Sequence, residues 1–200
     1  MRLRRPLVLA SASPRRAELL RALGVEDFRI APTDVDERLP PGLPALEAPA
    51  YLSRLKSEAA DAHLDGEAVT LSADSLVVSE GRALGKPIDL AEAHAMLAYL
   101  CGREHTVVTG FTLARKGASG GVERKTEQVA TQVTLAPASE AEIAHYVRNF
   151  PPLDRAGSYG IQDWIGTSKA SRIEGSYTNV VGLPTAEVYA SLLAWDVLEV

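Results

Sequence analysis

The sequence predicts an α/β fold with a mixed central sheet and flanking helices. Segments of helical spacing alternate along the chain with apolar segments of strand character. The first apolar segment, Leu7 to Ala10, is a short continuous run, which is typical of a strand buried on both faces in a parallel sheet. Two long β-rich stretches, 105–114 and 127–135, follow each other across a glycine-rich connection at 116–121 and therefore look antiparallel. Parallel and antiparallel strands together make a mixed sheet.

The first elements are expected to be a strand, a helix and a second strand. Ser13 suits the N-cap of a helix and Pro14 its first position, while Gly24 suits the residue after its end. The second strand is expected over 28–31. The stretch 40–49 is predicted to be a loop because prolines and a glycine interrupt regular structure there.

The next elements are expected to be a helix and an interrupted strand. Apolar residues recur at helical spacing over 52–62. The apolar stretch after it is predicted to form two strands, 69–73 and 76–79, with a break at Asp74–Ser75 where polar residues interrupt the pattern.

Two helices in the second half are predicted from their capping signals. Asp89 with Glu92, and Ser139 with Glu142, each place an N-cap residue three positions before a glutamate, as in a capping box. The first of these helices is expected to end at Gly102. The remaining segments are expected, in chain order, to be a loop over 150–166, a strand over 169–173 and a helix over 185–195.

Composition and charge limit the function classes. The chain has 200 residues, 46% of them apolar, and a formal net charge of −5. This length and composition suit a single domain over residues 1–200 and argue against disorder. The acidic balance disfavours long nucleic acid as a partner. Cys101 is the lone cysteine, which excludes an intrachain disulfide framework.

No segment is expected to insert into a membrane. A membrane span needs about 20 apolar residues, and a signal peptide needs a longer apolar run than Pro6 to Ala10. We therefore expect a cytoplasmic protein that has no membrane partner.

The first candidate site lies where the first strand meets the following helix. Ser11, Ser13, Arg15 and Arg16 occupy this junction. Ligands bind at strand ends in α/β sheets, and a helix N-terminus offers free N–H groups and partial positive charge to a phosphate. Arginines in a first turn work against the helix dipole, so a bound anion would explain them. The alternative is a capped helix with solvated arginines.

A carboxylate interrupts the apolar stretch that follows the second helix. A buried aspartate is rare unless it is paired or binds a metal, so Asp74 is a candidate metal ligand or general base. An exposed turn between two short strands is the alternative. Lys56 borders the apolar face of the preceding helix, where a surface lysine with a partly covered stem is the common case.

The segment from Gly81 to Pro87 does not qualify as a P-loop. Three residues separate its glycines, and Pro87 follows Lys86 where Ser or Thr should hold magnesium. A Walker-type NTPase is therefore not supported. Lys86 remains as a lysine held by a tight turn or exposed on a hairpin.

An acidic cluster and a glycine-rich loop complete the candidates. Asp34, Asp36 and Glu37 would suit as magnesium ligands together with Asp74, because hard cations prefer carboxylates and phosphates. A solvated turn is the more common case for such a cluster. Gln162 ends a glycine-rich loop, and its amide both donates and accepts, which suits a base edge.

Taken in order, these pieces resemble the Maf family of nucleoside triphosphate pyrophosphatases. Each motif alone is weak, but the ordered set is specific and runs from about Leu7 to the last helix. The matching segments are Leu9–Arg16, Asp36–Glu37, Lys56, Ala73–Ser75, Gly85–Pro87, Gly102–Arg103, Lys125–Glu127, Asp154–Gln162 and Gly175–Pro184.

The resemblance implies two lobes around a deep cleft, similar to the fold of inosine triphosphate pyrophosphatases. It also implies a phosphoric anhydride hydrolase that splits a nucleoside triphosphate into the monophosphate and pyrophosphate. Arg15 in the Ser-Pro-Arg-Arg segment is similar to the subgroup acting on dTTP, UTP and modified pyrimidine nucleotides. Ser75 stands where this subgroup usually has Thr, and Asp163–Trp164 follow Gln162 where a small residue is common. These departures concern the base pocket and leave the phosphate chemistry unchanged.

The residues and the resemblance imply the same roles. Asp74 is the expected catalytic residue, which orients or deprotonates the attacking water. Glu37 and Asp74 are expected to hold a divalent cation, Mg²⁺ or Mn²⁺. Ser75 and Gln162 are expected to discriminate the base. The residues expected to bind the triphosphate end of the substrate are Ser11, Ser13, Arg15, Arg16, Lys56 and Lys86.

A nucleotide-binding regulator of cell division with little or no hydrolysis is the alternative function. The joint presence of Asp74, Lys86 and Arg15 argues against an inactive protein. The expected partner is a small-molecule nucleoside triphosphate, and a homodimer is compatible with the family.

Overall fold

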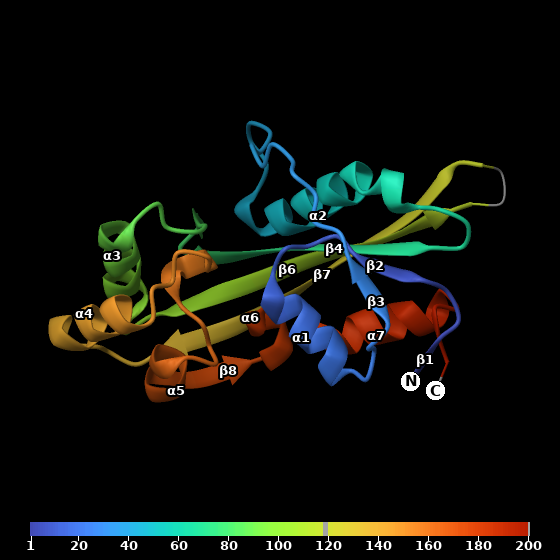
Figure 1. Ribbon diagram of the computed structural model, residues 1–200. Helices are drawn as coiled ribbons and strands as arrows, with labels where there is room; N and C mark the ends of the chain where they lie inside the picture. Colours follow the sequence, from blue (N-terminus) through green and yellow to red (C-terminus); the bar gives the residue numbers. More distant parts are fainter. Residues whose placement is uncertain (118–119, 200) are drawn as a thin grey trace. The chain divides into compact units, whose positions relative to one another are not determined.

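The computed structural model describes residues 1–117 and 120–199, and it confirms the α/β fold with a mixed central sheet and flanking helices (Figure 1). The sheet contains β2 (Leu7–Leu9), β3 (Phe28–Ile30), β4 (Val69–Ser79), β5 (Arg82–Leu84), β6 (Glu104–Lys116), β7 (Val122–Leu135) and β8 (Ala170–Glu174). Its strand order is β3-β2-β4-β6-β7-β8, and β5 pairs with β4. β2 runs parallel to β3 and β4, whereas β4–β5 and β7–β8 are antiparallel.

Helices and two short strands complete the described part of the chain. β1 (Arg2–Leu3) pairs antiparallel with β9 (Leu198–Glu199), and 3₁₀-helices lie at 45–47, 61–63 and 156–158. Within the described residues, no helix has the length and apolar character needed to cross a membrane. The α-helices are α1 (Pro14–Ala22), α2 (Ala48–Ala59), α3 (Leu90–Leu100), α4 (Glu140–Asn149), α5 (Trp164–Lys169), α6 (Tyr177–Val181) and α7 (Thr185–Ala194).

The chain divides into two compact units. Unit 1 comprises Met1–Asp74, Thr109–Val129 and Gly182–Val200, and unit 2 comprises Ser75–Val108 and Ala130–Val181. Each unit has its own apolar core. The expectation that residues 1–200 act as one domain remains a prediction.

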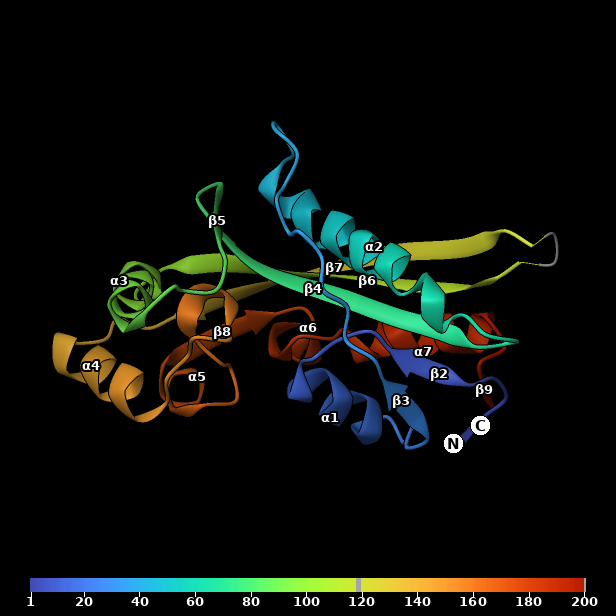
Figure 2. The same cartoon turned by 45° about the horizontal axis from the view of Figure 1, so that its top comes forward.

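In unit 1, α1 and α7 cover one face of the strands and α2 covers the other (Figure 2). Successive side chains of a strand point to opposite faces. Val69, Leu71 and Ala73 of β4 accordingly join the core beneath α1 and α7. The alternate residue Ser72 faces α2, where its hydroxyl donates to the Ser53 carbonyl at 2.7 Å. The same alternation assigns Asp74 to the face covered by α2.

The contact between α2 and the sheet is close and polar. A Cβ at Gly110 of β6 would lie 2.4 Å from the Pro49 carbonyl oxygen, so the helix backbone rests directly on a strand without a side chain. The hydroxyls of Ser53 and Thr112 hydrogen-bond at 3.0 Å beside it. This close approach fixes the height of α2, and with it Lys56, above the sheet.

Unit 2 is held by apolar contacts among its helices and strands. Leu97 and Leu100 of α3 pack with Ile143 of α4 and Ile165 of α5 in its core. The capping box that was predicted at the start of α4 is confirmed, with Ser139 as its N-cap residue. Asp89 caps α3 by accepting from the Glu92 N–H, but the Glu92 carboxylate binds the Ile88 N–H instead of the N-cap N–H. The capping prediction for α3 is therefore half confirmed.

Several predicted boundaries are wrong for identifiable reasons. β4 is continuous across Asp74–Ser75, because Lys56 pairs with the carboxylate that would otherwise be costly in a strand. The predicted loop 40–49 ends early, since α2 begins at Ala48 and its Pro49 occupies the first turn, where no N–H is needed.

Two further differences between the predicted and the observed elements lie in unit 2. One predicted segment falls partly on residues that the structure does not describe. The predicted loop 150–166 already contains the start of α5, and the short strand β5 was not expected. The predicted glycine-rich connection at 116–121 includes residues 118 and 119, which lie outside the described residues.

Candidate functional site

The N-terminus of α1 presents positive charge at the carboxyl end of β2. The first turn contains Arg15 and no acidic residue. Ser13 occupies the N-cap position as predicted, although its side chain makes no capping hydrogen bond within the described structure. Its N–H donates to Ser11 Oγ at 3.2 Å. First-turn N–H groups together with guanidinium groups suit a phosphate better than a cation.

The guanidinium of Arg16 connects three segments of unit 1. Its Nη1 donates to Ser11 Oγ at 3.1 Å and to the Ala73 carbonyl at 2.8 Å. Its Nε donates to the Gly182 carbonyl at 2.9 Å. Burial lowers the pKa of Arg16, and the nearby charge of Asp74 opposes this shift. Arg16 therefore supports the backbone directly before Asp74.

Lys56, Asp74 and Glu37 converge in unit 1. Lys56 Nζ lies 2.5 Å from Asp74 Oδ1 and 2.8 Å from Glu37 Oε1. The Lys56 and Asp74 side chains are each only 13% exposed, so little water separates these charges. The three residues come from α2, from β4 and from the segment between β3 and the first 3₁₀-helix. The structure thus brings Lys56 to the two carboxylates that were predicted together as metal ligands.

The three acidic residues before the proline-rich segment, Asp34, Asp36 and Glu37, differ in their contacts. Asp36 is exposed, and its carboxylate binds Arg38, whose Nε lies 2.7 Å from Asp36 Oδ2. These hydrogen bonds hold the pKa of Asp36 below its usual value. Glu37 instead reaches Lys56, whereas Asp34 is exposed. The predicted metal ligand of this cluster is therefore the residue that lies near Asp74.

The two carboxylates around Lys56 are of the type that hard divalent cations prefer. Glu37 and Asp74 direct carboxylate oxygens to one common atom, the Lys56 nitrogen. Mg²⁺ is commonly held by one or two carboxylates with substrate phosphates supplying further oxygens. Among the described residues there is no group of three or more His, Cys, Asp or Glu suited to a metal. The fit therefore requires a ligand that brings oxygens of its own.

The remaining predicted site residues belong to unit 2. Ser75 follows Asp74 on β4 and is partly buried, whereas Lys86 and Gln162 are exposed. Lys86 follows the short strand β5. The Gly157 N–H donates to the Gly85 carbonyl at 3.0 Å, so the loop that ends at Gln162 is bonded to the loop that carries Lys86. Two of the predicted site residues in unit 2, the cation Lys86 and the amide Gln162, thus lie on two connected loops.

Sequence reasoning missed a polar cluster beside Gln162. The Tyr146 hydroxyl donates to Asp163 Oδ2 at 3.0 Å, and Arg155 forms an ion pair with the same carboxylate. The one signal in the sequence was the charged residue Asp163 directly after Gln162. Its partners were not identifiable, since Tyr146 lies on a different helix.

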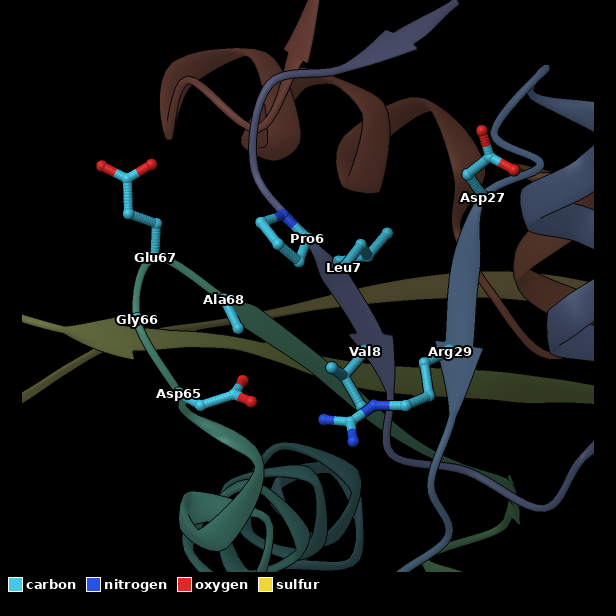
Figure 3. Close-up of a pocket in the computed structure, with 9 residues that line it drawn as sticks. All are labelled: Pro6, Leu7, Val8, Asp27, Arg29, Asp65, Gly66, Glu67 and Ala68. Atoms are coloured by element: carbon cyan, nitrogen blue, oxygen red, sulfur yellow. The ribbon is translucent and has the colours of Figure 1, made fainter.

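A separate hollow of about 660 Å³ lies at the opposite end of the strands (Figure 3). Pro6 and Leu7 at the start of β2, and Gly66 and Ala68 before β4, line it together with charged side chains such as Arg29. Ligands of α/β sheets bind at the carboxyl ends of strands. The start of α1 follows the carboxyl end of β2, and Asp74 lies beyond the part of β4 that pairs with β2. We therefore place the candidate site there and not in this hollow.

Most of the chain matches known proteins. A family model described as Maf-like protein matches residues 6–195. A dTTP/UTP pyrophosphatase from Flavobacterium psychrophilum is 42% identical over 189 residues, which cover 94% of this chain and 93% of that protein. One from Syntrophus aciditrophicus is 45% identical over 188 residues, which cover 93% of this chain and 88% of that protein. One from Bacteroides fragilis is 41% identical over 186 residues, with 93% and 94% covered.

Among solved structures, the nucleoside-triphosphatase/dITP/XTP pyrophosphatase from Mycobacterium abscessus is 13% identical to this chain. The alignment covers 93% of this chain and 92% of that one with a TM-score of 0.40.

Proposed function

The chain belongs to the Maf family, and from this membership we propose that it is a nucleoside triphosphate pyrophosphatase acting on dTTP and UTP. Relatives that align over more than nine-tenths of the chain carry the name dTTP/UTP pyrophosphatase. The observation that carries the proposal for this chain is the convergence of Lys56, Asp74 and Glu37 in the unit that also contains the basic N-terminus of α1.

The groups that bind the triphosphate are cationic side chains and hydroxyls. In unit 1, Arg15, Ser11 and Ser13 face the phosphates at the N-terminus of α1, and Lys56 offsets further charge. Arg16 belongs to the same phosphate-binding set. Its hydrogen bonds to Ser11 and to the Ala73 carbonyl also hold those two residues in position. Lys86 is the cation from unit 2 in the proposed set. Charge-assisted hydrogen bonds from such groups are the strong interactions available to a phosphate.

Asp74 acts on the water. Its carboxylate orients a water molecule and accepts a proton from it, while the water oxygen attacks the α-phosphorus. The bond between the α-phosphorus and the bridging oxygen breaks, and pyrophosphate leaves. Lys56, at 2.5 Å from Asp74, holds the carboxylate in place. Electrostatic stabilisation by such preorganised groups supplies a large share of catalysis in reactions of this type.

Glu37 and Asp74 would hold a divalent cation, Mg²⁺ or Mn²⁺, when nucleotide is present. Such a cation would supply Lewis-acid polarisation of phosphate oxygens and would offset their charge. The support is the fit of two converging carboxylates that lack a third protein ligand among the described residues.

Ser75 and Gln162 read the base. A hydroxyl and an amide each donate and accept hydrogen bonds, as the edge of a pyrimidine requires. The exposure of Gln162 leaves its amide accessible to a ligand. Modified pyrimidine nucleotides are included as substrates, since Ser75 is smaller than the threonine usual in the subgroup.

The setting of the protein follows from its substrate. We expect residues 1–200 to act as one functional domain, as the length and composition favour. Nucleoside triphosphates are held in the cytoplasm, which supports a cytoplasmic location. The partner is a small molecule and not long nucleic acid, as the net charge of −5 favours. A homodimer is compatible with the family.

A nucleotide panel tests the proposal. The protein is incubated with Mg²⁺ or Mn²⁺ and with each common ribo- and deoxyribonucleoside triphosphate, and pyrophosphate and monophosphate are quantified. We expect equimolar products with dTTP and UTP as preferred substrates. Tight nucleotide binding without product would favour the nucleotide-binding regulator, and orthophosphate with a nucleoside diphosphate would place the attack at a different phosphorus.

A further inference from the structure

The loop that ends at Gln162 is anchored by a largely buried ion pair in unit 2, that of Arg155 and Asp163. The Asp163 carboxylate pairs with Arg155 Nη1, and the two side chains are 13% and 20% exposed. The same carboxylate oxygen accepts a hydrogen bond from the Tyr146 hydroxyl at 3.0 Å. The residue directly after Gln162 is therefore fixed by two side chains, one from its own loop and one from α4.

The anchor also reaches the backbone before Gln162. The Gly160 N–H donates to the Tyr146 hydroxyl oxygen at 3.2 Å. Burial, followed by the charge of Asp163, raises the pKa of Tyr146, so the hydroxyl keeps its proton and remains a donor. Tyr146 thus joins the backbone two residues before Gln162 to the side chain one residue after it.

The position of Asp163 shows that its carboxylate is committed to this cluster. Asp163 occupies the N-cap position of α5, where an aspartate ordinarily accepts from a first-turn N–H. Its side chain makes no such capping bond within the described structure. A capping hydrogen bond typically contributes about 1 kcal/mol to stability. Asp163 lacks this contribution and interacts with Arg155 and Tyr146 instead.

Gly160 is the residue that makes room for the ion pair. A Cβ at Gly160 would lie 1.6 Å from Arg155 Nη1 and 2.7 Å from Asp163 Oδ2. The guanidinium therefore crosses the loop in contact with its backbone. At the other end of the loop, Gly157 with a φ of 67° donates to the Gly85 carbonyl. The loop is held at both ends and across its middle.

We propose that Asp163, together with Arg155 and Tyr146, is a positioning residue that sets base selectivity by fixing the backbone on both sides of Gln162. This inference rests on the proposed function, in which Gln162 contacts the base. An amide on a mobile loop can turn to satisfy either a carbonyl or an amino group on a base, whereas a fixed amide favours one of them. Asp163 is thus expected to affect the choice of base more than the phosphate chemistry.

Base selectivity separates this role from a merely structural one. The ratio of kcat/KM for UTP to kcat/KM for CTP is measured for the wild type, Asp163→Asn and Tyr146→Phe. A variant that is partly unfolded loses both activities equally, so this ratio does not depend on the folded fraction. Asp154→Asn is the matched control, because Asp154 also approaches Arg155, at 3.6 Å, but its side chain is 61% exposed.

We expect the ratio to fall about tenfold in Asp163→Asn and in Tyr146→Phe, mainly through KM for UTP, and to stay unchanged in Asp154→Asn. Amide hydrogen exchange of the peptide covering 156–163 is expected to become faster in the first two variants. This second readout needs no activity. If Asp163→Asn does not fold, Tyr146→Phe supplies both measurements.

The outcomes are distinguishable from failure of the proposed function. A wild type that releases no pyrophosphate from any nucleotide overturns the proposed function and this inference with it. A wild type that is active but unselective, or variants that retain the wild-type ratio or exchange rate, overturn this inference and leave the proposed function standing.

Discussion

Lys56 Nζ lies 2.5 Å from Asp74 Oδ1, although the two residues belong to different elements, α2 and β4, and are 18 positions apart. The contact exists because β4 turns its even-numbered side chains toward α2 and because Gly110 lets that helix approach the sheet. Removing one member of a poorly exposed ion pair leaves the other charge uncompensated. The pair is therefore central to both the local structure and the proposed chemistry.

Replacing Lys56 should disable catalysis while its neighbour on α2 tolerates change. We expect Lys56→Ala to lower kcat/KM for UTP by about 100-fold or more, as loss of one preorganised charged donor typically does. Arg54→Ala is the control, because Arg54 is exposed and pairs with Glu58 one turn along the same helix. Steady-state kinetics of both variants check this, and equal losses would contradict it.

Glu37 should control the requirement for the divalent cation. Glu37→Gln keeps the shape and removes the negative charge, so the Mg²⁺ concentration giving half-maximal activity should rise about tenfold or more. Asp36→Asn should leave that concentration unchanged, since Arg38 binds the Asp36 carboxylate. Activity is titrated against Mg²⁺ at saturating UTP. If the Mg²⁺ concentration for half-maximal activity rose in Asp36→Asn but not in Glu37→Gln, the assignment of the cation to Glu37 would be wrong.

Gly110 should be intolerant of a side chain. Gly110→Ala would place a Cβ 2.4 Å from the Pro49 carbonyl oxygen, and the neighbour is backbone that cannot turn aside. Overpacking of this kind costs about 1–3 kcal/mol in the free energy of unfolding. Gly85→Ala is the matched control, because no atom lies within 4 Å of its Cβ position. Urea denaturation of both variants measures the difference, and equal stability would contradict the close approach of α2.

His105 should make stability fall in mild acid. Burial lowers the pKa of His105 to about 4, and its Nε2 lies 2.7 Å from the Tyr159 hydroxyl. The unfolded chain, with a histidine pKa of about 6.5, binds the proton first as pH falls, so stability is complete above about pH 6.5 and decreases toward pH 4. The decrease attributable to this residue is about 1–3 kcal/mol.

His105→Gln should flatten the dependence of the free energy of unfolding on pH between about 6.5 and 4. His63→Gln provides the control, because His63 is partly exposed in a 3₁₀-helix. Denaturant midpoints are collected at half-unit pH steps for the wild type and both variants. The same slope in His105→Gln and the wild type would show that His105 titrates normally in the folded protein.

The sequence predicted a helix or strand correctly where all the residues that determine it lie close together in the chain. Ser139 and Glu142 lie three residues apart and form the capping box of α4 without help from the rest of the chain. The predicted break at Asp74 failed because the residue that makes an aspartate tolerable in β4 is Lys56, on another element. A tertiary partner overrode the local pattern.

The same distinction applies to the candidate site. Residue types and motif order identified Glu37, Lys56 and Asp74 individually, but spacing alone could not show that one lysine nitrogen contacts both carboxylates. The cluster of Arg155, Asp163 and Tyr146 escaped prediction for the same reason. Such side-chain contacts depend on how helices are placed on a sheet, which periodicity does not specify.

The most direct test of the account is a comparison of wild type and Asp74→Asn. Nucleotide binding is measured by calorimetry with UTP and Ca²⁺, and single-turnover release of UMP and pyrophosphate is measured with Mg²⁺. We predict that Asp74→Asn binds UTP within about tenfold of the wild type but releases products at least about 1,000-fold more slowly, since the group that activates water is gone. Product release by Asp74→Asn at a rate near that of the wild type would contradict the assignment of Asp74 as the catalytic residue.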